Sequence, residues 1–402
     1  MLTFDEALAR VLDDAPRVGD ERVAFTDCVG RVLADDVRAR APQPAFDYSA
    51  MDGYAVRAAE LSARGDLTLK VVGESRTGAP PPEPIAEGSA CRIFTGALIP
   101  PGADAVVMQE DVTRDGDAAR FARAARHGEN IRRRGEDVSE GAVVLAKGTR
   151  VTPFQIALLA SVEALRVTVA RRPVVSILST GDELRDAGTA DHPGSVVDAN
   201  GPGLAALVAM CGGAPRVMPF VRDDLAGTEA AIAQALASSD LVITVGGVSV
   251  GDHDVVRTAM ERAGVALDFW KVAIRPGKPL CMGRAGRVRV LGLPGNPSSA
   301  TLTFVLFGAP LVRAMQGDLR AVAPRVEATL DGTLRQPAGR TSFVRVTLDE
   351  RSGGAVAARP LANQASGAVT SFAWADALAV LPADAASLAS GAKVTCVRLR
   401  DV

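Results

Sequence analysis

Hydrophobic positions change their spacing along this 402-residue chain, and each change predicts a different kind of secondary structure. Residues 4–12 carry apolar side chains at helical spacing, and Thr3 with Glu6 forms a capping box, so we expect an amphipathic helix there. Residues 21–37 alternate Val with polar residues, which predicts short strands or an extended arm. The chain therefore begins with a helix and continues as an extended segment.

The next hundred residues have a β-like pattern. From Phe46 to Val138, short apolar runs alternate with clusters of Gly and Pro, and the Pro-rich stretch 79–84 excludes regular structure. Residues 143–170 predict a strand, a helix after Thr152-Pro153 and a second strand. We expect this segment to pair with residues 20–40, so that the β-rich part is an insertion. The short apolar runs are 67–72, 91–94 and 105–108.

From Pro173 onward, continuous apolar strands alternate with helices, which predicts a parallel sheet covered by helices on both faces. The last eighty residues return to short alternating runs, which predict a small β-barrel or sandwich. The expected strands of the sheet are Pro173–Leu178, Val217–Val221, Leu241–Val245, Leu280–Met282 and Val288–Leu293. The expected helices are Gly201–Met210, Leu225–Ala237, His253–Ala263 and Ser298–Val312.

The fold class is accordingly α/β multidomain, with a central doubly wound, mostly parallel sheet. We predict an elongated framework domain from residues 1–40 and 140–172, and an inserted β-rich domain at 41–139. The α/β domain covers 173–322, and a C-terminal β-barrel domain covers 323–402.

Composition excludes several classes of protein. A net charge of −2 argues against a nucleic-acid partner. The five Cys are far apart without a CxxC pair, which excludes a Cys-based zinc site and fits reduced thiols in the cytoplasm. The N-terminus is charged and amphipathic, unlike a secretory signal. Pro294 and Pro297 shorten the uncharged stretch before Arg313 to a helix of about fifteen residues, so we expect a buried core helix and no membrane partner.

Candidate chemistry gathers where the predicted strands of the sheet end, the position at which open parallel sheets bind ligands. Gly-bearing turns follow there: STGDEL from Ser179, GGVSVGDHD from Gly246, IRPGKP from Ile274 and GLPGNP from Gly292. Glycines let the main chain approach an anion closely, although each turn alone is also compatible with a simple tight turn. The dinucleotide and P-loop fingerprints are both absent from the sequence, and we find no Ser/His/Asp or Cys/His constellation.

Carboxylates occur on the same expected edge, and they repel one another unless a cation lies between them. Oxygen ligands of this kind suit Mg²⁺, for which Asp254 together with Asp223 or Asp224 are the candidates. Capping of a following helix explains Asp223 and Asp224 equally well. His253 is better explained by solvation or capping than as a ligand.

Lysine is rare in this chain, with five Lys against forty Arg, yet Lys271 and Lys278 fall within one eight-residue stretch, on either side of Arg275. Three cations near the Gly turns suggest an anionic substrate, either a phosphate or an oxyanion, although chance clustering of the two Lys stays open. In the inserted part, FDYSAMDGYAV from Phe46 contains both Tyr residues of the chain. The Arg triplet 132–134 is either a solvated turn or an anion clamp.

These motifs resemble, in the same order, those of the molybdopterin molybdenumtransferase family, to which the E domain of gephyrin is also related. The matching stretches are FDYSAMDGYAV, IFTGA, NIRRRGEDV, STGDEL, GGVSVGDHD, IRPGKP and GLPGNP. The resemblance implies an enzyme that takes adenylylated molybdopterin and molybdate, releases AMP and places molybdenum on the dithiolene with the help of Mg²⁺. It also implies an elongated homodimer whose site lies between the α/β domain of one subunit and the inserted domain of the other.

The resemblance also implies functional positions. Asp52, Thr95, Asp137, Glu183, Asp223, Asp254, Lys271, Pro294 and Pro297 correspond to functional residues of the family. Arg275 occupies a position where the family usually has Lys, and Arg345 and Ser366 resemble its oxyanion-site residues. Together with the turn residues, the full set of candidates adds Lys278, Thr180, Gly181, Asp224, Gly246, Gly247, Ser249, Gly251, Pro279 and Ser298.

Two other functions fit parts of the sequence. A molybdopterin adenylyltransferase would use a similar α/β domain, and a non-catalytic molybdopterin-binding scaffold would keep the fold without the reaction. The intact carboxylates and the domains outside residues 173–322 favour molybdenum insertion. Possible partners are a molybdopterin adenylyltransferase that supplies the substrate and the molybdoenzymes that receive the product.

Overall fold

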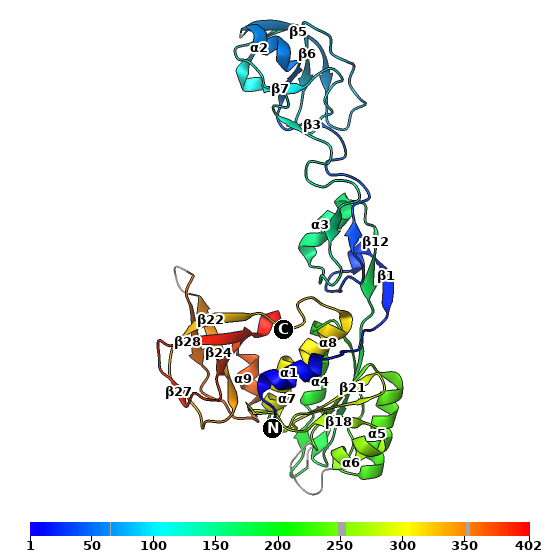
Figure 1. The fold of residues 1–402 in the computed structure, drawn as a ribbon, viewed down its shortest axis with the longest axis vertical. Helices are drawn as coiled ribbons and strands as arrows, with labels where there is room; N and C mark the ends of the chain where they lie inside the picture. The colour runs from blue at the N-terminus through cyan, green and yellow to red at the C-terminus, as the bar shows by residue number, and fades with distance from the viewer. Residues whose placement is uncertain (65, 191, 248–254, 351–353) are drawn as a thin grey trace.

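A computed structural model describes residues 1–64, 66–190, 192–247, 255–350 and 354–402. Figure 1 shows an elongated molecule. The α/β part and the C-terminal part lie side by side at one end, the framework strands follow, and residues of the inserted part form the opposite end. The N-terminus lies between the α/β and C-terminal parts (Figure 1). The fold class expected from the sequence is confirmed by this arrangement.

The N-terminal helix α1 (Phe4–Leu12) is capped as predicted. The backbone N–H of Glu6 donates to Thr3 Oγ1 at 3.3 Å, and the backbone N–H of Thr3 donates to Glu6 Oε2 at 2.8 Å. The buried Phe4 makes edge-to-face contacts with Phe307 at 5.5 Å and with Phe343 at 5.1 Å between ring centroids. Because Phe307 belongs to the α/β part and Phe343 to the C-terminal part, α1 packs the two together.

The framework strands pair as expected between residues 20–40 and 143–170. Strand β1 (Asp20–Ala24) runs antiparallel to β12 (Arg166–Ala170), and β2 (Val37–Arg38) runs antiparallel to β11 (Val143–Leu145). Helix α3 (Pro153–Ser161) begins with Pro at its first turn, as the sequence predicts, and buries Leu159 in the framework core. The chain therefore leaves this framework and returns to it around the inserted part.

The inserted part holds a six-stranded sheet with the order β7-β4-β6-β5-β9-β8, together with helix α2 (Ala58–Arg64). The three strands predicted from apolar runs are present, and the Pro-rich stretch 79–84 lies outside regular structure. A short pair, β3 (Tyr48–Ser49) and β10 (Ile131–Arg132), lies at the end toward the framework. The six strands are β4 (Gly53–Val56), β5 (Leu67–Ser75), β6 (Ser89–Ile93), β7 (Ala105–Met108), β8 (Val112–Asp115) and β9 (Ala118–Phe121).

The α/β part is built on a second six-stranded sheet, ordered β16-β13-β17-β21-β20-β18. Its first four strands are parallel to one another, and the last two pairings, β21 with β20 and β20 with β18, are antiparallel. Helices α5 (Leu225–Ser238) and α6 (Val255–Arg262) cover one face, while α4 (Asn200–Met210) covers the other. The strands are β13 (Val174–Ser179), β16 (Ala214–Val217), β17 (Leu241–Val245), β18 (Ala266–Phe269), β20 (Cys281–Ala285) and β21 (Val288–Leu293).

One predicted strand was misplaced. Strand β16 occupies Ala214–Val217, whereas the sequence favoured Val217–Val221. Helix α4 ends at Met210, and the strand already begins at Ala214, where residues 214–217 pair in register with residues 174–177 of β13. Further on, Pro219 has no N–H to give to a ladder, and the chain departs from the sheet before a single bridge at Val221.

The buried helix is longer than predicted. It continues from α7 (Pro297–Thr303) through a π-helical turn, η3 (Phe304–Gly308), into α8 (Ala309–Gln316). The ring of Pro310 would collide with the carbonyl one turn earlier in a regular α-helix, and the wider π-turn just before it accommodates this residue. These twenty residues are long and apolar enough to cross a membrane, but 89% of the most apolar window is buried inside the protein, so this is a core helix.

The C-terminal part is a closed barrel, which settles the choice between barrel and sandwich. Five strands follow one another, and the pairing of β24 with β26 closes the ring. Strand β19 (Ile274–Arg275) of the α/β part adds in parallel to β24, and helix α9 (Val369–Ala373) packs against α7. The strands are β22 (Arg325–Leu330), β24 (Thr341–Glu350), β25 (Val356–Pro360), β26 (Ala377–Leu381) and β28 (Lys393–Arg398), with a small pair β23 (Leu334–Arg335) and β27 (Ser387–Leu388).

Candidate functional site

A cavity of 490 Å³ opens at the carboxyl ends of β13, β17 and β21, the edge at which the sequence places the chemistry. The turn that follows each strand lines this cavity. The structure therefore brings together residues that are up to 117 positions apart between Thr180 and Pro297. The predicted residues found in the lining are Thr180, Gly181, Glu183, Asp223, Gly246, Gly247, Pro279, Pro294 and Pro297.

The turn after β17 requires glycine at two successive positions. Gly246 has φ +92° and Gly247 φ +61°, and a Cβ on Gly247 would lie 2.2 Å from Val256 Cγ2. The N–H of Gly246 donates to the carbonyl of Leu293 at 3.1 Å, and the N–H of Gly181 donates to the carbonyl of Val221 at 3.0 Å. Gly246 and Gly247 therefore shape the turn after β17. The N–H groups of Gly246 and Gly181 are already engaged within the protein. The predicted residues Ser249, Gly251 and Asp254 lie outside the described residues.

The two neighbouring aspartates have different surroundings. Asp224 is the N-cap of α5, and its carboxylate accepts hydrogen bonds from the N–H groups of Ala226 and Gly227. Asp223 lines the cavity, and its pKa is raised first by partial burial and then by the charges of Asp182 and Glu183. The geometry thus favours capping for Asp224 and a ligand-facing role for Asp223.

A divalent cation fits the chemistry of this acidic edge. A raised carboxyl pKa beside two further carboxylates marks repulsion that a cation would relieve, and all three offer the hard oxygen donors that Mg²⁺ prefers. Within the described ranges, no group of three or more His, Cys, Asp or Glu side chains is close enough to form a complete metal site. The third predicted ligand, Asp254, falls in the segment that is not described.

The three predicted cations lie on one exposed loop. The N–H of Val272 donates to the carbonyl of Lys278 at 3.1 Å, which closes the base of the loop. Arg275, in β19, pairs with Ser342 of the barrel, so this cation lies at the junction with the C-terminal part. Lys278 precedes Pro279, which lines the cavity. Among the described residues, none of the three cations forms an ion pair.

Arg345 is the most unusual charged residue in the described chain, because its side chain is buried with 0% exposure and faces no carboxylate within ion-pair distance. Burial lowers its pKa. Its Nη2 donates to the carbonyl of Ala365 at 3.2 Å, and Phe372 lies under the guanidinium at 5.6 Å. Nε and Nη1 have no partner among the described residues. A buried cation with two unused donors is costly unless an anion joins it.

The loop around Arg345 is tied to the edge of the cavity. The N–H of Ser298 donates to the carbonyl of Ser366 at 3.0 Å, and Ser298 Oγ donates to the carbonyl of Ala368 at 2.6 Å. Ser298 follows Pro297, which lines the cavity. The candidates Arg345, Ser366 and Ser298 are therefore connected to the cavity by direct contacts, although they do not line it.

The remaining candidates lie at the other end of the molecule. Asp52 accepts hydrogen bonds from the N–H of Thr95 at 2.7 Å and from Thr95 Oγ1 at 2.8 Å, and these bonds lower its pKa. Asp137 is exposed at the end of the inserted segment, where its N–H donates to the carbonyl of Gln43 at the start of that segment. Figure 1 shows that the inserted part is remote from the α/β part within one chain.

The Arg triplet behaves as a neutralised turn. Arg132 pairs with Glu136 at 3.0 Å, and Arg133 pairs with Asp47 at 2.8 Å. Arg134 reaches Glu140 at 3.5 Å. With a carboxylate beside each guanidinium, the structure favours the turn over the anion clamp.

Several residues that line the cavity were not among the candidates from the sequence, and the polar ones include Asp198, Asn200 and Asn296. Asp198 Oδ1 accepts hydrogen bonds from the N–H groups of Asn200 and Gly201 at the start of α4. An Asp two residues before a helix is a capping signal, and it would have marked this turn. Asn296 stands at the N-cap of α7, but its side chain makes no capping hydrogen bond.

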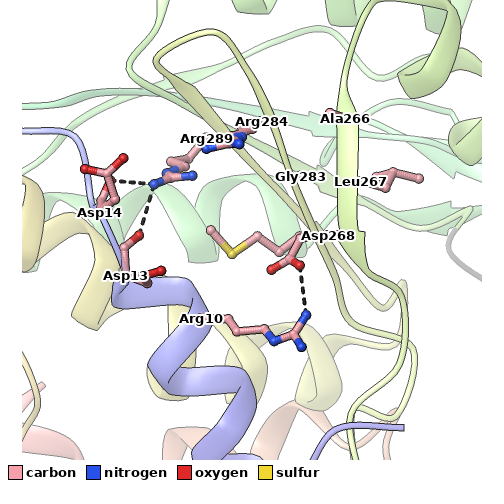
Figure 2. Close-up of a pocket in the computed structure, with 10 residues that line it drawn as sticks. Arg10, Asp13, Asp14, Ala266, Leu267, Asp268, Gly283, Arg284 and Arg289 are labelled. Atoms are coloured by element: carbon pink, nitrogen blue, oxygen red, sulfur yellow. Dashed lines mark hydrogen bonds and ion pairs between the residues drawn. The ribbon is translucent and has the colours of Figure 1, made fainter.

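A second cavity, of 430 Å³, lies between α1 and the antiparallel edge of the α/β sheet (Figure 2). Its charged groups are largely engaged. Arg10 pairs with Asp268 at 2.9 Å, and Arg289 Nη2 donates to the carbonyls of Asp13 and Asp14 (Figure 2). None of the predicted functional residues lines it, and its contacts hold the N-terminal segment against the sheet.

Comparison with known proteins agrees with this architecture. Residues 2–162 match the MoeA N-terminal region (domain I and II), residues 176–314 a probable molybdopterin binding domain, and residues 327–399 the MoeA C-terminal region (domain IV). The fold is thus that of a multidomain protein whose α/β domain matches a probable molybdopterin binding domain. The chain belongs to the molybdopterin molybdenumtransferase (MoeA) family, a family of transferases in molybdenum cofactor biosynthesis.

The relatives extend over essentially the whole chain. The molybdopterin molybdenumtransferase of Haemophilus influenzae is 37% identical over 98% of both chains. That of Bacillus subtilis is 36% identical over 100% of this chain and 94% of its own length. The crystal structure of the molybdopterin biosynthesis moeA protein from Pyrococcus horikoshii superposes with a TM-score of 0.86 at 30% identity, covering 99% of this chain and 100% of the other.

Proposed function

We propose that this protein inserts molybdenum from molybdate into adenylylated molybdopterin and releases AMP. The observation that carries this proposal is Arg345, a fully buried cation that has no carboxylate partner and two unused donors within the described structure. A molybdate oxyanion supplies the missing charge and accepts the unused N–H groups. The contact between Ser298 and Ser366 supports a position for such an anion site next to the cavity that would hold the pterin substrate.

The residues of the cavity would divide the remaining work. Asp223 and Glu183 would hold Mg²⁺ with Asp254, and Thr180 would border the phosphates. When bound, Mg²⁺ offsets the negative charge of the pyrophosphate group as its bond to AMP breaks. Lys271, Arg275 and Lys278 would attract the phosphates and the molybdate. These roles rest on the acidic edge and the exposed cationic loop described above.

A homodimer would complete the site. Asp52 and Thr95 form a preorganised pair that lies far from the cavity of their own chain (Figure 1). Supplied by a second copy, this pair and Asp137 would face the substrate. Asp52 is well suited to accept a hydrogen bond, because its lowered pKa keeps it ionised.

The direct test is an assay of AMP release from adenylylated molybdopterin with Mg²⁺ and increasing molybdate. We expect release that depends on molybdate. ATP consumption without molybdate would instead support adenylyl transfer, and binding without turnover would support a scaffold. Failure to release AMP at any molybdate concentration would exclude the proposal.

Arg345→Met tests the observation that carries the proposal. Removing an unpaired buried charge should leave the fold as stable as wild type or more stable, while the molybdate concentration for half-maximal rate rises about tenfold or more. Arg359→Met, which removes an exposed cation paired with Asp331 at 2.8 Å, serves as the control and should leave the molybdate dependence within about twofold. An unchanged molybdate dependence in Arg345→Met would show that the oxyanion binds elsewhere.

A further inference from the structure

Two kinds of surface line the cavity of the α/β part. One is the acidic edge with Glu183 and Asp223. The other is formed by the short parallel pair β14 (Leu184–Arg185) and β15 (Val196–Val197) and by the start of α4, and it carries Asp198 and Asn200. Val196 is 55% exposed although it is apolar. This second surface has the chemistry of a ring-binding site, because an apolar face lies next to polar groups.

Asp198 is held in place but is only partly satisfied. Its Oδ1 accepts two hydrogen bonds, from the N–H of Asn200 at 3.1 Å and from the N–H of Gly201 at 3.0 Å. Its Oδ2 receives no hydrogen bond from the described residues. A Cβ at position 201 would lie 2.7 Å from Oδ2, so the glycine leaves room beside this oxygen. The carboxylate is therefore fixed by the helix and keeps acceptor capacity for a ligand.

The neighbouring amide is committed to the turn. Asn200 Nδ2 donates to the carbonyl of Gly295 at 2.8 Å and so joins the start of α4 to the turn after β21. Its Oδ1 accepts no hydrogen bond from the described part of the chain. Both residues thus present oxygen acceptors at the cavity, while the amide donor of Asn200 is already used.

We infer that Asp198 is the specificity residue for the pterin ring, whose amino group and adjacent ring N–H would both donate to its carboxylate. This deepens the proposed function and rests on it. A carboxylate accepts two parallel N–H groups in the same way as it accepts the fork of an arginine. The edge of adenine offers a donor beside an acceptor, which a carboxylate matches poorly. The pterin half of the substrate is therefore placed at α4, with Val196 and Val197 beside the ring.

The arrangement also orients the substrate. The phosphates are negative and are disfavoured beside the carboxylate of Asp198, whereas a cation at Asp223 would attract them. Asp198 would thus recognise the pterin ring, while Asp223 would bind the phosphates through a metal ion.

Asp198→Asn is the informative variant, because Asn caps a helix as well as Asp does but places an amide donor where the ring N–H groups need an acceptor. The control is Asp104→Asn, since Asp104 also accepts a hydrogen bond from the start of a helix, the N–H of Ala58 at 2.6 Å, but lies in the inserted part. Asp198→Ser provides a second capping residue without the carboxylate. Thermal unfolding verifies that each variant is folded.

The readouts are the KM and kcat for adenylylated molybdopterin and the equilibrium binding of a phosphate-free pterin and of AMP. We expect Asp198→Asn and Asp198→Ser to weaken pterin binding and raise KM by roughly tenfold or more, with kcat and AMP binding nearly unchanged. Asp104→Asn should match wild type. Pterin binding equal to wild type in both Asp198 variants, or a loss of AMP binding instead, would overturn the inference. The inference and the proposed function can also fail separately. If the Asp198 variants lose pterin binding but the wild type shows no molybdate-dependent AMP release, the inference is supported and the proposed function is excluded.

Discussion

Thr95 donates two hydrogen bonds to Asp52, one from its main chain at 2.7 Å and one from its hydroxyl at 2.8 Å, and both reach the same carboxylate oxygen. The pair joins the end of β6 to the turn before β4. A carboxylate held in this way stays ionised and fixed in orientation. Both properties are needed if, as proposed, Asp52 of one subunit faces the substrate that is bound in the cavity of the other.

Thr95→Val should raise the pKa of Asp52 toward its ordinary value, because the hydroxyl donor is lost while the main-chain donor stays. In the wild type, the stabilisation from these bonds is complete above the unfolded value near 3.8 and is lost as the pH falls through the lowered folded pKa. Carboxyl carbon NMR during a pH titration measures the shift. An identical Asp52 titration in Thr95→Val would show that the hydroxyl contributes nothing.

Gly247→Ala should destabilise the turn that borders the cavity. The left-handed conformation alone costs an alanine about 1–2 kcal/mol, and the contact with Val256 adds roughly another 1–3 kcal/mol. Gly264→Ala is the matched control, because Gly264 has φ +84° but open space around its Cβ position. Urea unfolding of both variants separates clash from backbone strain, and equal losses would rule out the clash.

Asp223→Asn should stabilise the protein in the absence of Mg²⁺ and abolish much of the stabilisation that Mg²⁺ confers. A folded-state pKa above the ordinary value of 3.8 means that the ionised form is disfavoured, so this destabilising contribution appears as the pH rises through the raised pKa and is present at neutral pH. Thermal unfolding at pH 7 with and without Mg²⁺ measures both effects, each expected to be roughly one to three degrees. Asp186→Asn, at an exposed position outside the cavity, is the control.

Lys271→Arg should lower kcat/KM about tenfold or more, because a guanidinium cannot replace a compact ammonium where an anion is held by a point charge. Lys393→Arg is the matched control. Lys393 lies on the barrel, where it pairs with Glu327 at 3.1 Å between exposed side chains, and its replacement should change the rate by less than about twofold. If both variants lose activity equally, the position of Lys271 has no special role.

Local patterns predicted most of the elements. The capping box at Thr3 and the apolar run of β17 depend on neighbours in the sequence, and both appear where expected. The end of the core helix could not be predicted, because Arg313 looks like a solvated residue. In the structure Arg313 is buried, and its Nη1 donates to the carbonyl of Asp401 at 3.0 Å. Such a partner lies 88 residues away and is set by tertiary packing alone.

The site was predictable to the extent that topology determines it. The carboxyl ends of parallel strands must meet, so Thr180, Gly246 and Pro294 could be placed together from the order of the strands. The different surroundings of Asp223 and Asp224 could not be predicted. Which of the two carboxylates caps α5 depends on the residue at which the helix begins, and a shift of that start by one residue would exchange their roles. Asp198 carries a capping signal before α4, but its place in the cavity depends on the tertiary approach of the turn after β21, which the local sequence does not show.

The contact between residues 298 and 366 tolerates substitution. Its hydrogen bond runs from a main-chain N–H to a main-chain carbonyl, so it does not depend on which side chain stands at position 366. Substitutions at this position would therefore leave this bond between the barrel and the α/β part in place. Under the proposed function, a change at position 366 would thus act on the choice of oxyanion and leave the alignment of the two parts unchanged.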